Sequence, residues 1–145
     1  MRRVLLALLA TAGLIGCQKT GGEFILGPTD ANVSGTFALK DINGGLLPVV
    51  ARQTTTEQWD LTADTMVVAG DSTWAETSRY TVTVFADGAT RQEQTRAAGV
   101  YRITNAQIAF TMLVGGTATF TGAVQGNTLT VLYNDAHFTY SRAQP

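Results

Sequence analysis

Few side chains in this 145-residue chain have the chemistry of catalysis or metal binding. The chain contains one histidine, His137, and one cysteine, Cys17, so the usual zinc ligand sets cannot be assembled. No serine lies in a nucleophile motif such as Gly-x-Ser-x-Gly. We therefore expect a protein that is not an enzyme, with no bound metal and no cofactor, and we expect His137 to be an ordinary strand residue at the surface or rim.

The acidic residues are scattered along the chain. Asp60, Asp64 and Asp71 lack the dense oxygen-ligand spacing of a calcium loop, so we expect them to cap turns and to keep strand ends soluble. A carboxylate pair of the kind that cleaves glycosides could be formed by Glu57 with Asp60 or by Glu76 with Glu93, but nothing in their positions favours that chemistry.

One predicted strand combines aromatic and acidic side chains on a single face. Trp74, Glu76 and Tyr80 are separated by even numbers of residues and therefore share a face, and Tyr101 belongs to the following antiparallel strand. If this face points into a barrel, the four residues line a pocket at one barrel end. The aromatic rings would form its walls, and Glu76 would orient a ligand amine or hydroxyl.

A carboxylate inside a protein needs a partner. Arg96 or Arg102 on the next strand could pair with Glu76, and Ser78 shares its face. The alternative is that Glu76 lies at the open rim and is simply hydrated, because eight-stranded barrels can be filled by their own side chains. We favour the hydrated rim for Glu76.

The N-terminal segment has the pattern of an export signal. Arg2 and Arg3 precede an apolar run of 12 residues from Val4 to Ile15. As a helix this run spans about 18 Å, well short of the roughly 30 Å hydrocarbon core of a membrane. A short apolar run between basic and small residues is typical of a secretory signal rather than a transmembrane anchor.

The run ends in Leu14-Ile15-Gly16-Cys17, which resembles the lipobox of bacterial lipoprotein signal peptides. In that family the cysteine thiol receives a diacylglyceryl group, the preceding peptide is removed, and the new N-terminus is acylated with a fatty acid such as palmitate. The resemblance implies that residues 1–16 are a signal peptide and that lipid on Cys17 anchors the protein in the cell envelope. Gln18, rather than Asp, follows the cysteine, which implies the outer membrane, facing the periplasm.

Removal of residues 1–16 leaves 129 residues, enough for one domain with a core. Two of the ten basic residues leave with the signal, so eight remain against eleven acidic ones and the formal charge is −3. No basic patch survives, which argues against a nucleic-acid partner. Residues 17–32 are rich in breakers and predict a flexible tether. Residues 33–145 form the predicted domain, which we expect to be a monomer without a disulfide.

The predicted domain has the composition of an all-β protein. Threonine occurs 23 times in the chain, and apolar and polar residues alternate in several runs between turn dipeptides. Phe37, Phe110, Phe120 and Leu129 are expected to share one core. The patterns predict an antiparallel sandwich or an up-and-down barrel. They predict eight or nine strands, near residues 34–42, 48–56, 58–69, 74–86, 90–103, 107–114, 117–125, 128–134 and 136–142.

A series of short motifs recurs in a characteristic order: Gly35-Thr36-Phe37, Asn43-Gly44, Asp71-Ser72-Thr73-Trp74, Gly99-Val100-Tyr101, Ile108-Ala109-Phe110-Thr111, Phe120-Thr121-Gly122 and Gly126-Asn127-Thr128-Leu129-Thr130. The series resembles the lipocalin-like domain of small bacterial lipoproteins over about residues 35–142. The resemblance implies an antiparallel, eight-stranded up-and-down barrel, with Arg142 packed over Phe37 as lipocalins pack a terminal arginine over an aromatic ring. Ser72 and Phe37 replace the Gly and Trp of the family patterns, so no classical lipocalin ligand is carried over.

These observations lead to two hypotheses about function. The first is a lipid-anchored envelope protein of lipocalin-like fold that binds a small apolar or amphipathic ligand at one barrel end. The second is a filled barrel that contacts an envelope protein through its outer surface or loops, for example as an inhibitor. A cavity of ~300 Å³ or more on the inner face favours the first hypothesis.

Overall fold

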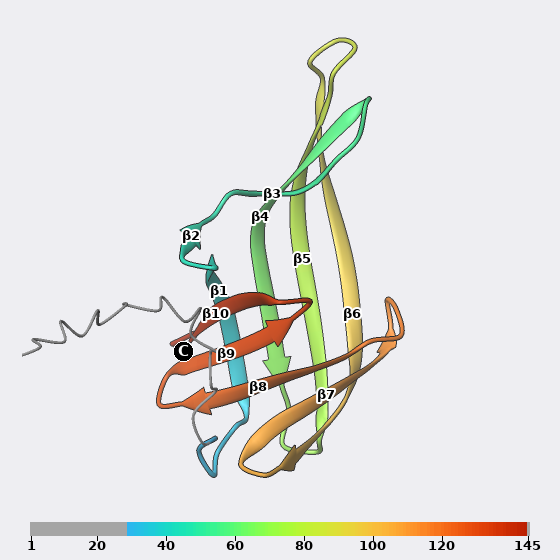
Figure 1. The fold of residues 1–145 in the computed structure, drawn as a ribbon. Coiled ribbons are helices and arrows are strands. Elements are labelled where there is room, and N and C mark those ends of the chain that lie inside the picture. Colours follow the sequence, from blue (N-terminus) through green and yellow to red (C-terminus); the bar gives the residue numbers. More distant parts are fainter. Residues whose placement is uncertain (1–28, 145) are drawn as a thin grey trace, which may run out of the picture.

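The computed structural model describes residues 29–144, so the predicted signal peptide, Cys17 and most of the predicted tether lie outside the described residues. The described part contains ten strands, and Figure 1 shows them as a single curved sheet. The strands are β1 (Gly35–Ile42), β2 (Gly45–Leu46), β3 (Val49–Gln53), β4 (Glu57–Val68), β5 (Thr73–Val84), β6 (Thr90–Thr104), β7 (Gln107–Val114), β8 (Thr119–Gln125), β9 (Thr128–Tyr133) and β10 (Ala136–Arg142).

The sheet closes into a barrel through β1. From β4 to β10 each strand pairs antiparallel with the next, and β1 pairs antiparallel with both β10 and β4. Eight strands thus form a closed up-and-down barrel, which confirms the predicted fold class. β2 and β3 are additions that pair with the outer ends of β1 and β4, respectively.

The turns adopt the backbone conformations that their residues favour. Asn43 and Gly44 have φ angles of 52° and 78°, and Asn134 and Asp135 have φ angles of 48° and 60°. Paired positive φ angles match the twist of a tight hairpin, and Asn, Asp and Gly tolerate them best. The turn between β6 and β7 was not evident from its residue types. Ala106 has a positive φ of 60° there, a conformation that alanine rarely adopts.

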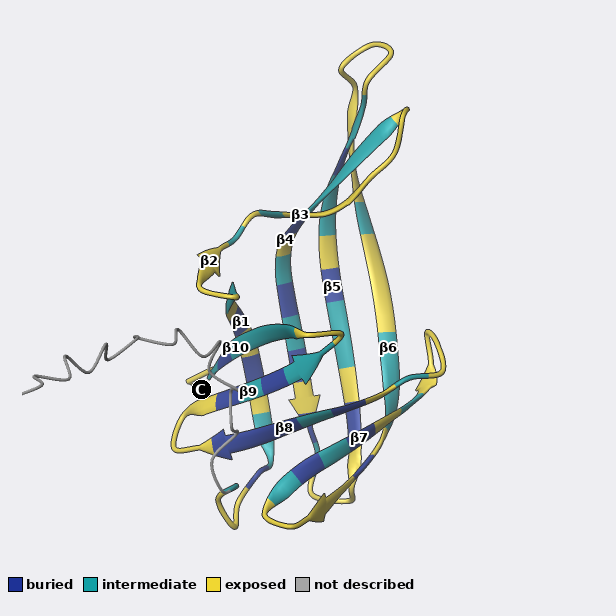
Figure 2. Ribbon diagram, viewed as in Figure 1, coloured by how far each residue is buried: buried dark blue, intermediate teal, exposed yellow. Residues whose placement is uncertain are grey.

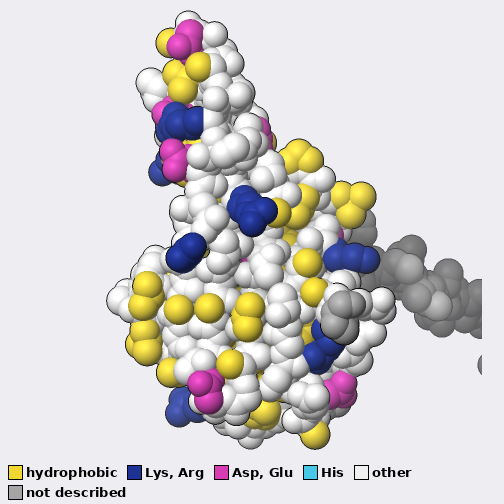
Figure 3. Space-filling model, turned by 180° about the vertical axis from the view of Figure 1, so that it is seen from behind, with side chains coloured by type: hydrophobic (Ala, Val, Ile, Leu, Met, Phe, Trp, Pro, Cys, Tyr) yellow, Lys and Arg dark blue, Asp and Glu magenta, His cyan; other side chains and the backbone are white. Residues whose placement is uncertain are grey.

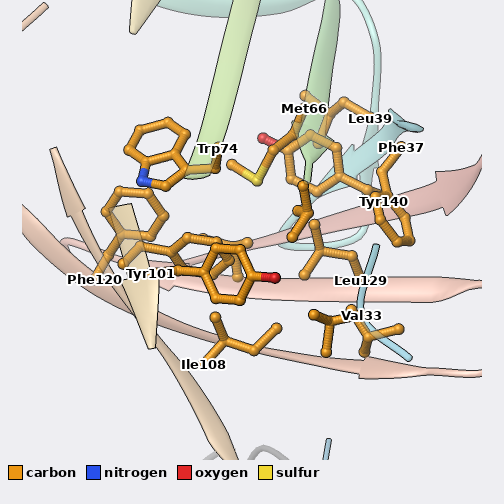
Figure 4. Close-up of a cluster of buried hydrophobic side chains, with 14 of the residues drawn as sticks. Val33, Phe37, Leu39, Met66, Trp74, Tyr101, Ile108, Phe120, Leu129 and Tyr140 are labelled. Carbon is orange, nitrogen blue, oxygen red and sulfur yellow. The ribbon is translucent and has the colours of Figure 1, made fainter. Parts of the chain in front are cut away.

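The barrel has two unlike ends. The turns β4–β5, β6–β7 and β8–β9 lie at one end, here called the closed end, and the β9–β10 turn lies at the other, the mouth. The inward-facing side chains of the closed half form one packed core (Figure 4). Figure 2 shows where the buried residues lie along the strands. The four residues predicted to share a core, Phe37, Phe110, Phe120 and Leu129, all belong to it, which confirms that prediction.

Trp74 is central to this core and is only 2% exposed. Its indole packs edge-on against Phe110 and Phe120, with ring centroids 5.9 and 5.2 Å away. The indole N–H donates to the carbonyl oxygens of Val100 and Thr111, at 3.2 and 3.3 Å. A side chain at position 99 would collide with the carbonyl of Thr111 and with this indole, so only Gly99 permits the close approach.

The two ends of the domain meet at Phe37. The guanidinium carbon of Arg142 lies 4.7 Å from the centre of the Phe37 ring, and the same guanidinium donates to the carbonyl oxygen of Ser34. This is the packing that the lipocalin resemblance implied for Arg142. The cation–π contact and the hydrogen bond join β10 to the start of β1.

The last residues of the predicted tether are attached to the closed end. The backbone N–H of Thr29 donates to the carbonyl of Ala106, and that of Asp30 donates to the carbonyl of Val124. The Asp30 carboxylate accepts from the backbone N–H of Gly126 at 2.6 Å. The chain therefore enters the barrel at the closed end, opposite the mouth.

Beyond the mouth, four strands continue as a projecting sheet, here called the extension, made of residues 49–61 and 80–93 (Figure 1). The first half of β6 pairs with β5 alone, because β7 pairs only from Ala98 onward. Figure 3 shows acidic and basic side chains grouped along the extension. Arg91 bridges Glu57 and Glu93 at 2.9 and 3.0 Å, and such charges discourage a free strand edge from pairing with another chain.

Candidate ligand-binding site

A cavity of about 500 Å³ opens at the mouth, where the extension leaves the barrel. Residues of six strands line it, and most of its wall is apolar. Its lining consists of Ile42, Val49, Val50, Ala51, Leu61, Asp64, Glu76, Ser78, Tyr80, Tyr133 and Phe138. The volume lies within the range of small-molecule sites.

The cavity forms where β4 changes its neighbour. The second half of β4 pairs with β1, ending at the pair Ala38–Thr65, whereas its first half pairs with β3, ending at the pair Val49–Leu61. Residues 62–64 of β4 lie between these two ladders and pair with neither β1 nor β3. The barrel wall is therefore open at this point, and Asp64 lies directly beside the gap.

A β-bulge in β4 turns Asp64 inward. Leu61 pairs with Tyr80 and Ala63 pairs with Arg79, so Thr62 is an extra residue on β4. Strict alternation would place Asp64 and Leu61 on opposite faces. The inserted residue shifts the alternation, so that both side chains face the cavity, and Asp64 is only 5% exposed. The expectation that Asp64 caps a turn or a strand end is therefore wrong, whereas Asp71 does cap the β4–β5 turn through the backbone N–H of Thr73.

Two hydroxyl groups bind the two carboxyl groups of the site. The Ser78 hydroxyl donates to Oδ2 of Asp64 at 2.6 Å, and the Tyr140 hydroxyl donates to Oε1 of Glu76 at 3.2 Å. The Asp64 carboxyl also interacts with the Glu76 carboxyl and with the Tyr140 hydroxyl. The two carboxyl groups and the two hydroxyl groups therefore form one polar cluster at the base of the cavity.

Burial dominates the electrostatics of the two carboxyl groups. Burial and, next to it, the negative charge of neighbouring Asp64 raise the pKa of Glu76 to about 8. Burial also raises the pKa of the Asp64 carboxyl, against the opposing hydrogen bonds that involve Ser78, Glu76 and Tyr140. Burial raises the pKa of Tyr140 well above its ordinary value, so this hydroxyl remains a donor. Near neutral pH the two carboxyl groups therefore hold a proton between them.

The surroundings of Glu76 differ from both sequence-based expectations. The ion pairs between side chains of residues 29–144 are those of Arg91, and both Arg96 and Arg102 are exposed, so neither arginine supplies the expected partner. The partner is Tyr140, from the opposite wall of the barrel. Glu76 is also not a freely hydrated rim residue, because it is half-buried and its carboxyl accepts from the Tyr140 hydroxyl.

A second, much smaller chamber lies beneath the mouth cavity. It measures about 50 Å³, room for a few water molecules, and it shares Glu76, Tyr133 and Phe138 with the cavity above. Its other walls include Met66, Met112, Phe120 and Tyr140. Glu76 therefore lies at the boundary between an open cavity and a nearly filled core.

The structure separates the four residues that were predicted to line one pocket. Glu76 and Tyr80 line the mouth cavity. Trp74 and Tyr101 lie in the closed-end core (Figure 4), and the Tyr101 hydroxyl donates to the carbonyl of Ala69 in the β4–β5 turn at 2.8 Å. Both rings contribute to packing and not to the cavity wall.

Sequence reasoning missed Asp64 and an aromatic residue that packs against the cavity wall. Trp59, on the inner face of β4, packs edge-on against Tyr80 with ring centroids 5.7 Å apart, and Arg52 lies 4.2 Å above its ring. Trp59 and Tyr80 also line an adjoining hollow of about 310 Å³. The even spacing of Glu57, Trp59 and Leu61 was the available signal for this inner face.

Comparison with known proteins identifies no relative: no protein-family model, no curated protein and no solved structure matches the chain. Among residues 29–144, no group of three or more His, Cys, Asp or Glu side chains is placed to hold a metal ion. In the same part of the chain, no helix is long and apolar enough to cross a membrane. A functional assignment therefore depends on the geometry of the mouth cavity.

Proposed function

We propose that this protein is a lipid-anchored, non-enzymatic protein of the cell envelope that binds a small amphipathic ligand in the mouth cavity. The observation that carries the proposal is a cavity of about 500 Å³ with apolar walls and a few buried polar groups at its base. Such a combination is the usual form of a small-molecule site, in which apolar walls supply affinity and polar groups supply orientation.

The position of the cavity is compatible with an anchor at Cys17. The described chain enters the barrel beside the β6–β7 and β8–β9 turns, at the closed end. The mouth opens at the other end of the barrel, so a ligand reaches it without passing the point where the tether joins. The closed end, where the tether joins, has a filled core.

Ligand binding in the mouth should be visible in the fluorescence of Trp59. This ring contacts Tyr80 of the cavity wall, whereas Trp74 is buried at the closed end. We expect titration with octylamine or 1-octanol to shift the tryptophan emission of the wild type and of Trp74→Phe. The shift should disappear in Trp59→Phe. Absence of any response to both amphiphiles up to their solubility limits, with the fold intact by circular dichroism, would contradict the proposed function.

The lipid anchor is tested separately at Cys17. Cys17→Ala should leave the precursor uncleaved or release the protein from the membrane, because several acyl chains contribute about 0.8 kcal/mol per buried methylene and one short chain alone holds only marginally. Fractionation of cells followed by mass spectrometry of the N-terminus measures both effects. Wild-type protein recovered entirely in the soluble periplasmic fraction would refute the anchor.

The extension favours one alternative function, the binding of an envelope protein. It presents exposed apolar side chains, including Val50 and Phe85, and it also carries the stack of Arg52 on Trp59. Aromatic and arginine side chains are enriched in protein interfaces. Under this alternative, the wild-type protein should bind no amphiphile. Truncation of the extension tip should abolish binding of the partner protein.

A further inference from the structure

We infer that the mouth cavity selects organic cations, namely ligands that carry a protonated amine on an apolar body, with the Asp64 carboxylate as the counter-ion; this selectivity rests on the ligand-binding function proposed above.

The charged side chains that line the cavity are all acidic. Its lining includes two carboxyl groups, Asp64 and Glu76, and the hydroxyl groups of Ser78, Tyr80 and Tyr133, with no Lys, Arg or His side chain. An anionic ligand would meet two carboxyl groups without a compensating positive charge. A cationic group, in contrast, would meet the opposite charge in a partly dehydrated site, where the attraction is stronger than in water.

The hydrogen-bonding state of Asp64 points to the same ligand chemistry. Asp64 is only 5% exposed and it lines the cavity. Ser78 donates to Oδ2, and the carboxyl also interacts with the Glu76 carboxyl and the Tyr140 hydroxyl. When both carboxyl groups are ionised, the proton that they share is lost, and an N–H donor of a ligand can take its place between them. An ammonium group supplies up to three such donors.

The walls of the cavity suit the remainder of such a ligand. Ile42, Val49 and Phe138 supply apolar surface, and the Tyr80 ring offers a face to a cation or to an aliphatic chain. The cavity volume of about 500 Å³ fits a molecule with a single short chain or ring. The cavity therefore matches a small amphipathic amine rather than a bulky lipid.

The ionisation of the site supports the selectivity. The groups that face Glu76 are Asp64 from β4 and Tyr140 from β10, Tyr133 from β9 lines the same cavity, and β6 contributes Ala97 beside it. Because burial raises the pKa of both carboxyl groups, an entering cation favours the ionised state and displaces a proton. Amine affinity should therefore increase as the pH rises toward 8.

The selectivity can be measured with three probes of equal chain length. The mature lipidated chain in lipid nanodiscs is titrated by calorimetry at a pH of about 8 with octylamine, 1-octanol and octanoate, and empty nanodiscs correct for partitioning. We expect octylamine to bind roughly tenfold or more tighter than the other two, the range of a charge-assisted hydrogen bond. Asp64→Asn should reduce octylamine to the level of 1-octanol. Asp60→Asn, which removes a carboxylate from the same strand outside the cavity lining, should leave the preference unchanged.

Each remaining outcome overturns a defined part of the proposal. Equal binding of the three probes, or an amine preference that survives in Asp64→Asn, would overturn the cation selectivity and leave ligand binding intact. Binding of none of the probes would overturn the proposed function and the selectivity together. If Asp64→Asn fails to fold, Glu76→Gln provides the second test, since loss of the neighbouring carboxyl should also reduce the amine preference severalfold, and an unchanged preference there would count against the inference.

Discussion

Replacing Phe110 by Ala is expected to lower the free energy of unfolding by roughly 3–5 kcal/mol, the usual cost of removing a buried aromatic ring. Phe110 is fully buried, stacks on Phe120 with ring centroids 4.9 Å apart, and also contacts Trp74. Folded domains are stable by only about 5–15 kcal/mol. The substitution should therefore lower the denaturant midpoint strongly, or unfold the domain, as measured by circular dichroism during urea denaturation.

Phe85→Ala is the matched control for this loss. Phe85 lies beyond the end of β5, near the tip of the extension, and is 45% exposed. Substitution there should change the free energy of unfolding by less than about 0.5 kcal/mol. Similar losses for the two variants would contradict the assignment of the core to the closed half of the barrel.

The stability of the domain should decrease as the pH rises from about 4.5 to about 8. The pKa of the Glu76 carboxyl is raised from its ordinary value of 4.5 to about 8 in the folded protein, so the folded state binds this proton more tightly than the unfolded state. Below the lower value the group is protonated in both states. Above the higher value it is ionised in both, and the cost of burying the charge is complete. At about 1.4 kcal/mol per pKa unit, the loss amounts to a few kcal/mol.

Glu76→Gln should remove most of this dependence. The amide keeps the shape of the side chain and an acceptor for the Tyr140 hydroxyl, but it does not ionise. Urea denaturation of the variant at several pH values should give a flatter profile and higher stability than the wild type at pH of about 8. Glu93→Gln, on the exposed part of β6, should retain the wild-type slope. If the free energy of unfolding of the wild type does not fall between pH of about 4.5 and about 8, ionisation of Glu76 costs the folded state little.

The strands and their faces were largely predictable, because alternation and turn chemistry are local properties. Asn43-Gly44 and Asn134-Asp135 form turns because their residues tolerate positive φ angles. The alternation of β5 placed Glu76 and Tyr80 on one inner face, as the structure has them. The packing of Arg142 on Phe37 also followed from sequence, through the family resemblance.

The composition of the cavity was decided only by tertiary structure. Trp74 and Tyr80 share a face of one strand, yet a tilted 12-residue strand carries the first into the closed core and the second to the mouth. Alternation specifies the face of a strand but not the depth along the barrel axis. Depth depends on the register between strands, which is a property of the whole closed sheet.

Asp64 illustrates the same limit most directly. Its inward position depends on the extra residue Thr62 in β4, and a bulge of this kind has no distinctive residue type here. Its contact with the Glu76 carboxyl depends on the pairing of β4 with β5, and the Tyr140 hydroxyl reaches Glu76 only because the barrel closes through β1 and β10. Local patterning was therefore sufficient for an antiparallel all-β domain with Glu76 and Tyr80 on one strand face. The pairing of the buried Asp64 carboxyl with the half-buried Glu76 carboxyl beside an open cavity arises from contacts between residues far apart in the chain, which alternation does not encode.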